Sequence, residues 1–170
     1  MKAIGDLALP ASGSHEGPAF DDFYLQHHRE IYAAMWLVTR DRQEAEEVTQ
    51  DAFLKLLERW DRVGSMDDPT GYLFSTAMNV WRSRRRRAAV ALRRAIHPSE
   101  RPNELELAES RADVVRILSV LTPRQRAALV LVDLVGLSSE EAGDALGIRP
   151  STVRVQAARD RAALKERMSR

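Results

Sequence analysis

The sequence predicts an all-α protein of two small helical domains joined by a flexible linker, with a helix-turn-helix in the C-terminal domain. Three observations support this fold class. Gly and Pro are few, at 8 and 7 of 170 residues, and apolar residues recur at helical spacing along most of the chain. The polar stretch "HPSERPNE" at 97–104 carries two prolines and is typical of a linker between domains. We therefore expect a flexible extension at 1–18, a first domain at 19–96, a linker at 97–106 and a second domain at 107–170.

The first domain is predicted to hold three helices. Residues 20–38 form an apolar stripe, and the next helix begins at Asp41, with Glu44 as its capping-box partner. "DRVGSMDD" at 61–68 is a predicted loop, and Asp68 and Pro69 start a third helix that runs into the arginines. Apolar spacing predicts a core role for several side chains: Leu56, Leu57, Trp36, Trp60, Val80, Trp81 and, at the core edge, His27. His28 is expected at the surface.

The second domain is predicted to contain a helix-turn-helix. An apolar stripe over 107–121 is followed by the start of a new helix. There Thr122 is the N-cap, Pro123 is the first helical residue and Gln125 is the capping-box partner. Ser138 and Glu141 cap a short helix that ends at Leu146. Gly147 then makes a tight turn before a helix that begins near Pro150. The exposed start of that last helix offers the hydroxyl, amide and guanidinium groups that read DNA in the major groove.

Positive charge is concentrated in one stretch of a chain whose net charge is only +1. Residues 78–94, "MNVWRSRRRRAAVALRR", hold seven arginines and no acid. Cations at a helix C-terminus are stabilised by the helix macrodipole, but this effect explains only the first few of these arginines. A membrane-surface patch requires large exposed apolar residues, whereas those beyond the arginines are mostly Ala. Binding of nucleic acid and a solvated helix end remain as explanations, and membrane insertion is not expected.

Composition argues against several classes of function. The chain has no cysteine, which excludes disulfides, thiolate catalysis and zinc sites built on Cys. It contains neither a His-Glu-x-x-His motif nor a glycine-rich phosphate loop, and no set of nucleophile, base and orienting residue can be assembled. We expect a cytoplasmic protein that is not an enzyme and that uses no cofactor or metal.

Two stretches resemble the extracytoplasmic-function sigma factors of bacterial RNA polymerase. "AEEVTQDAFLKLLERW" with "GYLFSTAMNVWRSRRRR" is similar to the second domain of that family, and the stretch from "LTPRQRAALVLVDLV" to "ALKERM" is similar to the fourth. The resemblance covers roughly residues 19–168 and implies a dissociable subunit that recognises the −10 and −35 promoter elements and aids DNA melting. The implied partners are core polymerase (β′ clamp and β flap), promoter DNA and an anti-sigma factor. This factor would clamp the two domains and hide the faces at 47–54 and 149–159.

The resemblance also assigns roles to residues. The implied polymerase-binding face consists of Glu47, Gln50, Asp51 and Leu54. The implied −10 contacts are Asp61, Arg62, Val63, Gly64, Ser65 and Met66 in the base-capturing loop, with Asn79, Arg82, Arg84, Arg85, Arg86 and Arg87 on the following helix. The implied −35 contacts are Arg149, Ser151, Thr152, Arg154, Val155, Gln156 and Arg159.

One alternative to this function stays open. A stand-alone helix-turn-helix regulator would bind DNA without polymerase and would use a palindromic site. Its first domain would then serve dimerisation or ligand sensing.

Overall fold

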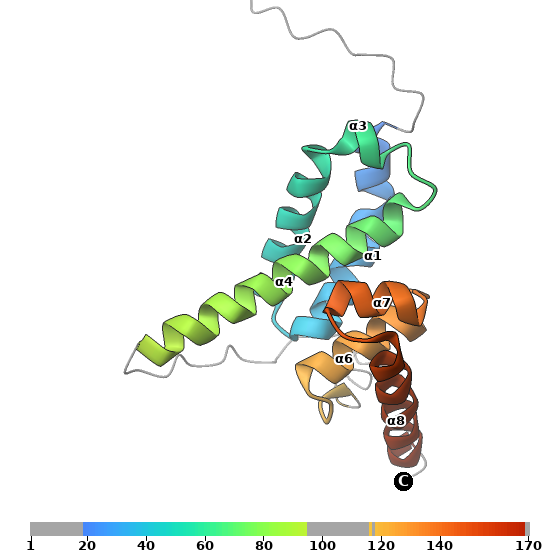
Figure 1. The fold of residues 1–170 in the computed structure, drawn as a ribbon. Coiled ribbons are helices and arrows are strands. Elements are labelled where there is room, and N and C mark those ends of the chain that lie inside the picture. The colour runs from blue at the N-terminus through green and yellow to red at the C-terminus, as the bar shows by residue number, and fades with distance from the viewer. Residues whose placement is uncertain (1–18, 95–115, 117, 169–170) are drawn as a thin grey trace, which may run out of the picture.

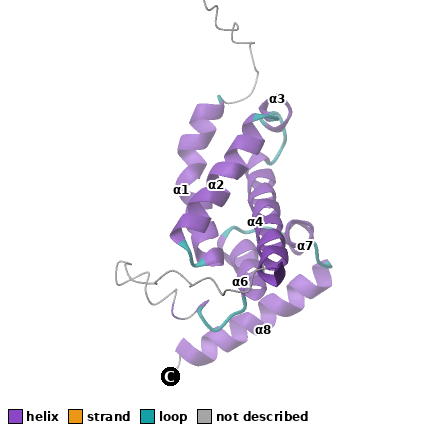
Figure 2. Cartoon of the chain, turned by 90° about the vertical axis from the view of Figure 1, so that its left-hand side faces the viewer, coloured by secondary structure: helices purple, strands orange, loops and turns teal. Residues whose placement is uncertain are grey.

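The computed structural model describes residues 19–94, 116 and 118–168, and all its regular elements there are helices (Figure 2). In chain order they are α1 (Phe20–Thr39), α2 (Arg42–Leu57), α3 (Trp60–Val63), α4 (Pro69–Arg94), α6 (Pro123–Leu129), the π-helix η1 (Val130–Leu134), α7 (Ser139–Leu146) and α8 (Pro150–Met168). We call α1–α4 the N-terminal domain and α6–α8 the C-terminal domain. The two-domain all-α prediction is confirmed, whereas the predicted extension, linker and most of the 107–121 stripe lie outside the described residues. None of the described helices is long and apolar enough to span a membrane.

Local capping signals set most helix boundaries. The Asp41 side chain accepts a hydrogen bond from the Glu44 amide at 2.8 Å, and Asp68 accepts one from the Gly71 amide at 2.8 Å. Complete capping boxes form between Thr122 and Gln125 and between Ser138 and Glu141. Each box satisfies two backbone amides that would otherwise lack a partner at the start of the helix. The predicted starts of these four helices are therefore confirmed.

Two elements depart from the prediction. Part of the expected 61–68 loop is the short helix α3, because Trp60 and Val63 are both buried and anchor one helical turn to the core. The helix that begins at Pro123 changes at Val130 to π geometry, and the Val135 amide bonds the Val130 carbonyl five residues back. Six consecutive residues, 126–131, are buried there, so this segment is enclosed on all sides.

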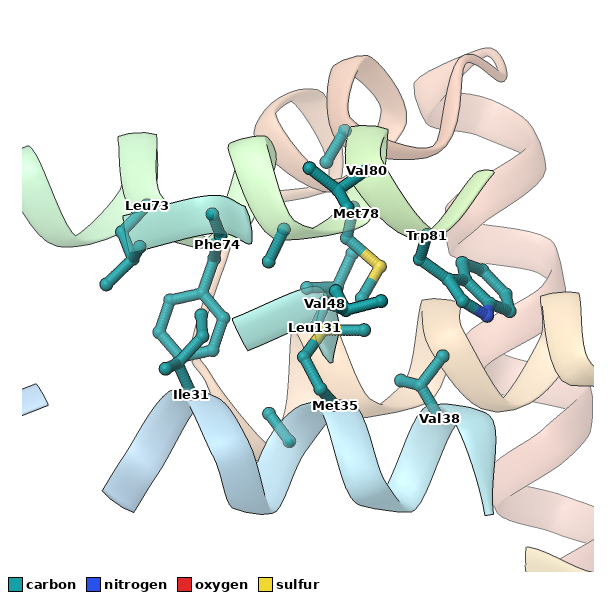
Figure 3. Packing of buried hydrophobic residues seen from close by; sticks show 14 of the residues in the cluster. Ile31, Met35, Val38, Val48, Leu73, Phe74, Met78, Val80, Trp81 and Leu131 are labelled. Atoms are coloured by element: carbon teal, nitrogen blue, oxygen red, sulfur yellow. The ribbon is translucent and has the colours of Figure 1, made fainter. Parts of the chain in front are cut away.

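The two domains pack against each other instead of keeping separate cores. One cluster of buried side chains runs from α1, α2 and α4 into η1 and α7. Figure 3 shows Leu131 of η1 among residues of the N-terminal domain. Helix α7 lies against α4, and α6 lies against α1. The C-terminal half of α4 projects beyond the bundle (Figure 1), which leaves its basic end open to solvent.

The predicted core is largely correct. Trp60, Val80 and Trp81 are buried, Trp36 is half-buried, and His27 lies at the core edge against the Phe23 ring. Two predictions are wrong. Leu57, expected inside, is exposed at the end of α2, and His28, expected at the surface, is half-buried because it stacks on Phe53.

Candidate nucleic-acid and polymerase interface

Helix α4 separates an apolar face from a basic one. Leu73, Phe74, Met78 and Trp81 face the core, while Asn79 and the guanidinium groups of Arg85, Arg86 and Arg87 are exposed. The guanidinium carbon of Arg85 lies 5.3 Å from the centre of the Trp81 ring, within the range of a cation–π contact. The burial of α4 therefore depends on its apolar face, and the exposed arginines are available to a ligand.

Arg84 differs from the arginines that follow it. Its guanidinium binds the Glu47 carboxylate and donates to Asp51 Oδ2 from Nε at 3.2 Å and from Nη2 at 3.0 Å. Hydrogen bonds from Arg84 and Gln43 lower the pKa of Glu47. This pairing thus stabilises the fold above the ordinary carboxyl pKa, and the contribution is lost as the pH falls through the lowered value. Glu47 and Asp51, predicted to bind polymerase, are thus paired with Arg84, which is predicted to contact DNA.

Arg82 reaches across to the C-terminal domain. Its Nη1 donates to the Ala145 carbonyl at 2.9 Å and to Asn79 Oδ1 at 3.3 Å. The guanidinium lies against Gly147, where a Cβ would stand 2.2 Å from Arg82 Nη2. Gly147 also has a φ of +62°, so both its backbone and its surroundings favour glycine. In this structure Arg82 therefore binds the turn of the helix-turn-helix.

A basic groove runs between α4 and the C-terminal domain. It encloses about 370 Å³, and the residues that line it are Asn79, Trp81, Arg82, Ser83, Arg85, Arg86, Arg124 and Leu146. The described lining holds four guanidinium groups and no carboxylate, a composition suited to phosphate. Arg124, on α6, was not among the predicted contacts; it is brought to α4 only by the packing of the two domains.

The segment 61–68 presents a small surface at the start of α4. Asp61, Arg62, Ser65 and Met66 are exposed, and the Ser65 hydroxyl donates to the Arg62 carbonyl at 3.0 Å. The prediction that Val63 contacts DNA is wrong, because Val63 lies on the inner face of α3 and its side chain is fully buried. Gly64 lies against the Trp60 ring, where a Cβ would stand 2.9 Å from the ring, so it can offer DNA only backbone groups.

The predicted polymerase face is partly open. Gln50 is exposed and Leu54 is 59% exposed on α2, while Glu47 and Asp51 are held by Arg84. The misassigned Leu57 is also exposed on this helix, three residues after Leu54. Exposed leucines beside charged groups are typical of a protein interface.

The helix-turn-helix presents most of its predicted DNA contacts. Arg149, Ser151, Thr152, Arg154, Val155 and Arg159 are all exposed. Gln156 is half-buried with its Oε1 enclosed, so it is turned toward the domain interior more than its neighbours. Arg154 Nη1 donates to Glu140 Oε1 at 3.2 Å, an exposed ion pair that a phosphate would readily replace.

Both domains of the chain match known protein families. Residues 23–90 match the family Sigma-70 region 2, and residues 111–164 match Sigma-70, region 4. The chain is 29% identical to the ECF RNA polymerase sigma factor SigE of Mycolicibacterium smegmatis, over 98% of this chain and 68% of that protein. It is 32% identical to the ECF RNA polymerase sigma factor SigM of Mycobacterium tuberculosis, over 86% of this chain and 75% of that one.

Solved structures share the fold. The sigma factor RpoE, in complex with the anti-sigma factor NepR from Bartonella quintana, matches with a TM-score of 0.70 and 23% identity, over 88% of this chain and 96% of that one. CnrH, in complex with the cytosolic domain of CnrY, matches with a TM-score of 0.57 and 24% identity, over 88% and 87%. The family matches and the sequence relatives establish that the chain belongs to the ECF sigma factors, the subunits that direct RNA polymerase to its promoters.

Proposed function

We propose that this sigma factor reads the −10 element with the loop at 61–68 and helix α4. Asn79 is an exposed amide on α4 and precedes three exposed arginines, Arg85 to Arg87. Guanidinium groups bind phosphate oxygens and so position the helix, while an amide suits base edges. Arg82 and Arg84 join this surface once they leave Ala145 and the two carboxylates that hold them. The observation that carries the proposal is the exposed basic face of a helix whose other face is buried.

The −35 element is the proposed target of α8. Ser151, Thr152 and Arg154 lie exposed in its first turns, Val155 is 53% exposed, and Arg159 follows one turn later. Val155 suits the methyl group of thymine, and the polar groups suit base edges and phosphates. Arg149 precedes the helix and lies within reach of the backbone of the same groove. Gln156 requires a rotamer change before its amide can take part.

Core polymerase is the proposed partner of α2. Gln50 and Leu54 are open on its surface, and Glu47 and Asp51 supply negative charge beside them. The β′ clamp is the partner that the family resemblance implies for this face, and the β flap is the one it implies for the C-terminal domain. The chemistry of transcription would belong to the polymerase, and this chain would act beside it in the cytoplasm as a positioning subunit without a catalytic group.

Regulation by an anti-sigma factor is the last part of the proposal. The sigma factor RpoE, a protein of the same fold, is described in complex with the anti-sigma factor NepR. Both functional faces of this chain lie on small domains, so one partner that spans them could cover both. A pull-down from native cells that returns polymerase subunits alone would argue against such a factor.

In-vitro transcription with core polymerase tests the main proposal. We expect promoter-specific transcripts only when the chain is present, and loss of them in Arg154→Ala. Arg161→Ala is the matched control, because Arg161 lies on the same helix but is held by Asp133 at 2.6 Å. Sequence-specific DNA binding without any transcript would instead favour a stand-alone regulator and overturn the proposal.

A further inference from the structure

We propose that the chain closes on itself through a reciprocal latch, in which one arginine of each domain caps the end of a helix in the other. Arg126 of α6 caps α1, and Arg82 of α4 caps α7. The latch withholds Arg82 from DNA until the domains separate, so the closed chain is autoinhibited without a partner. This inference rests on the proposed function for the role of Arg82 at the promoter.

Arg126 forms the first half of the latch. It is only 4% exposed, and its Nε and Nη2 donate to the Val38 carbonyl at 3.0 and 2.9 Å. Val38 lies in the last turn of α1, whose sequence is Trp-Leu-Val-Thr, so Arg126 adds a cation from the other domain to a negative helix end that has only its C-cap residue Arg40 as a local cation. Arg126 Nη1 also donates to the Leu118 and Leu121 carbonyls of its own part of the chain, at 3.5 and 3.3 Å. Separation of the domains takes the Val38 carbonyl away from Nε and Nη2, and a buried guanidinium group that loses acceptors is unfavourable.

Arg82 forms the second half. Its acceptor, the Ala145 carbonyl, lies in the last turn of α7, which reads Gly-Asp-Ala-Leu. Here too the positive charge at the helix end comes from the opposite domain. The bare Cα of Gly147 lets the guanidinium approach this closely. Each domain thus supplies one arginine and one helix end.

The apolar contacts between the domains act together with these hydrogen bonds. The buried cluster crosses from α1 and α4 into η1 and α7, so closure also removes apolar surface from water. Both domains belong to one chain, which makes their association intramolecular and raises its effective concentration. A modest interface is then sufficient to keep the closed form dominant.

DNA and α7 compete for the same guanidinium. While Arg82 binds Ala145, it is unavailable to a phosphate, and α7 lies over part of α4 beside it. The apparent affinity for DNA is therefore reduced by the fraction of open molecules. Loss of the latch should raise that affinity without any change in the residues that contact DNA.

The absence of cysteine allows a direct test on the full chain. Gln26→Cys and Ala162→Cys place one label on an exposed position of each domain, and their separation is measured by double electron–electron resonance. We expect one narrow distance distribution for the parent, and at least a tenfold rise in the ratio of open to closed molecules for Arg126→Met. Arg29→Met is the control, because it removes the same charge from an exposed position of α1 that does not line the groove between the domains.

Two further measurements keep the test decisive. Circular dichroism reports whether Arg126→Met stays folded, and Arg82→Gln, at a half-buried position, provides an independent opening of the latch. Affinity for a promoter duplex without polymerase should rise about tenfold in Arg126→Met, in proportion to the open fraction. An unchanged distance distribution in both folded variants, or opening of Arg126→Met without tighter binding, would overturn the latch. Failure of transcription with normal opening would instead overturn the proposed function and leave the latch standing.

Discussion

Asp160 is a buried carboxylate in the middle of α8. It is 2% exposed, accepts a hydrogen bond from Gln125 Nε2 at 3.0 Å and has its Oδ2 enclosed. Burial raises the pKa of Asp160, although the bond from Gln125 opposes this. The protonated form therefore favours folding: its contribution is complete below the ordinary carboxyl pKa and is lost as the pH rises through the raised value. At neutral pH the charge on Asp160 opposes folding.

We expect Asp160→Asn to be at least as stable as the parent at pH 7, because the amide keeps an acceptor for Gln125 and removes the buried charge. The advantage should shrink as the pH is lowered toward 4. Asp160→Ala is the control; it leaves the Gln125 amide without its acceptor and should lose about 1–3 kcal/mol. Urea unfolding at several pH values measures both. A parent that stays more stable than Asp160→Asn at pH 7 would contradict this account.

Glu47 is a second carboxylate with a shifted pKa, and it holds the proposed DNA contact Arg84 in an ion pair. We expect Glu47→Gln to tighten binding to a duplex a few-fold, because Arg84 keeps only Asp51. The Arg84 and Glu47 side chains are 30% and 40% exposed, so the loss of stability should be small. Fluorescence anisotropy with labelled DNA measures the affinity. Glu46→Gln, on the exposed side of α2, should bind as the parent does, and equal tightening in both variants would reduce the effect to net charge.

At the scale of the element, α7 depends on its N-terminal cap. The Ser138 hydroxyl accepts from the Glu141 amide at 3.1 Å, and Glu141 Oε2 accepts from the Ser138 amide at 2.7 Å. These bonds lower the pKa of Glu141. We expect Ser138→Ala to lose about 1 kcal/mol in chemical unfolding. Ser139→Ala, one residue later and inside the helix, should lose less; an equal loss would remove the cap as the cause.

Helix α4 should set the salt dependence of promoter binding. We expect Arg86→Gln and Arg87→Gln together to weaken binding and reduce the slope of log affinity against log salt by up to about 2, since each phosphate contact contributes about one. Arg161→Gln, held by Asp133, should leave the slope unchanged. Titrations with a promoter duplex from 50 to 200 mM salt provide the measurement. An unchanged slope in the double variant would make these arginines a solvated helix end.

The helix starts were predictable because caps are local signals. Asp41, Thr122 and Ser138 each bond an amide three residues ahead, and that spacing is visible in the sequence. The role of Arg126 could not be predicted from the sequence, because its acceptor, the Val38 carbonyl, lies 88 residues away. A lone cation at the start of the apolar run "RAALVLV" was the available signal. Leu57 was misplaced for a related reason, since its spacing fits the apolar stripe while no element covers the end of α2.

The exposed contacts on α8 followed from pattern and resemblance, but the pairing of Arg84 with Glu47 and Asp51 did not. These three residues come from two helices that meet only in the folded domain. Sequence reasoning placed them on two separate faces, whereas the fold makes them neighbours. The site residues themselves stay predictions until the binding experiments are done.

At the scale of the whole molecule, the shared core predicts cooperative unfolding. The buried cluster includes residues of both domains, so neither keeps its full apolar contacts alone. We expect one calorimetric transition, with equal calorimetric and van't Hoff enthalpies. Arg126→Met should separate this transition into two, and Arg29→Met, at an exposed position outside the groove between the domains, should not. Two resolved transitions in the parent would show that the domains are energetically independent.

The Val38 carbonyl under the Arg126 guanidinium also bears on protein engineering. Chimeras that exchange the C-terminal domain between relatives are a natural route to orthogonal promoters. Such a graft would place a foreign α6 beside this α1 and a foreign α7 beside this Arg82. Unless the incoming domain carries an arginine at the position of Arg126 and a glycine at that of Gly147, the hybrid should have a higher background activity even when its promoter specificity is correct. Leakiness in a chimera would then be repaired at these two positions, away from any residue that reads a base.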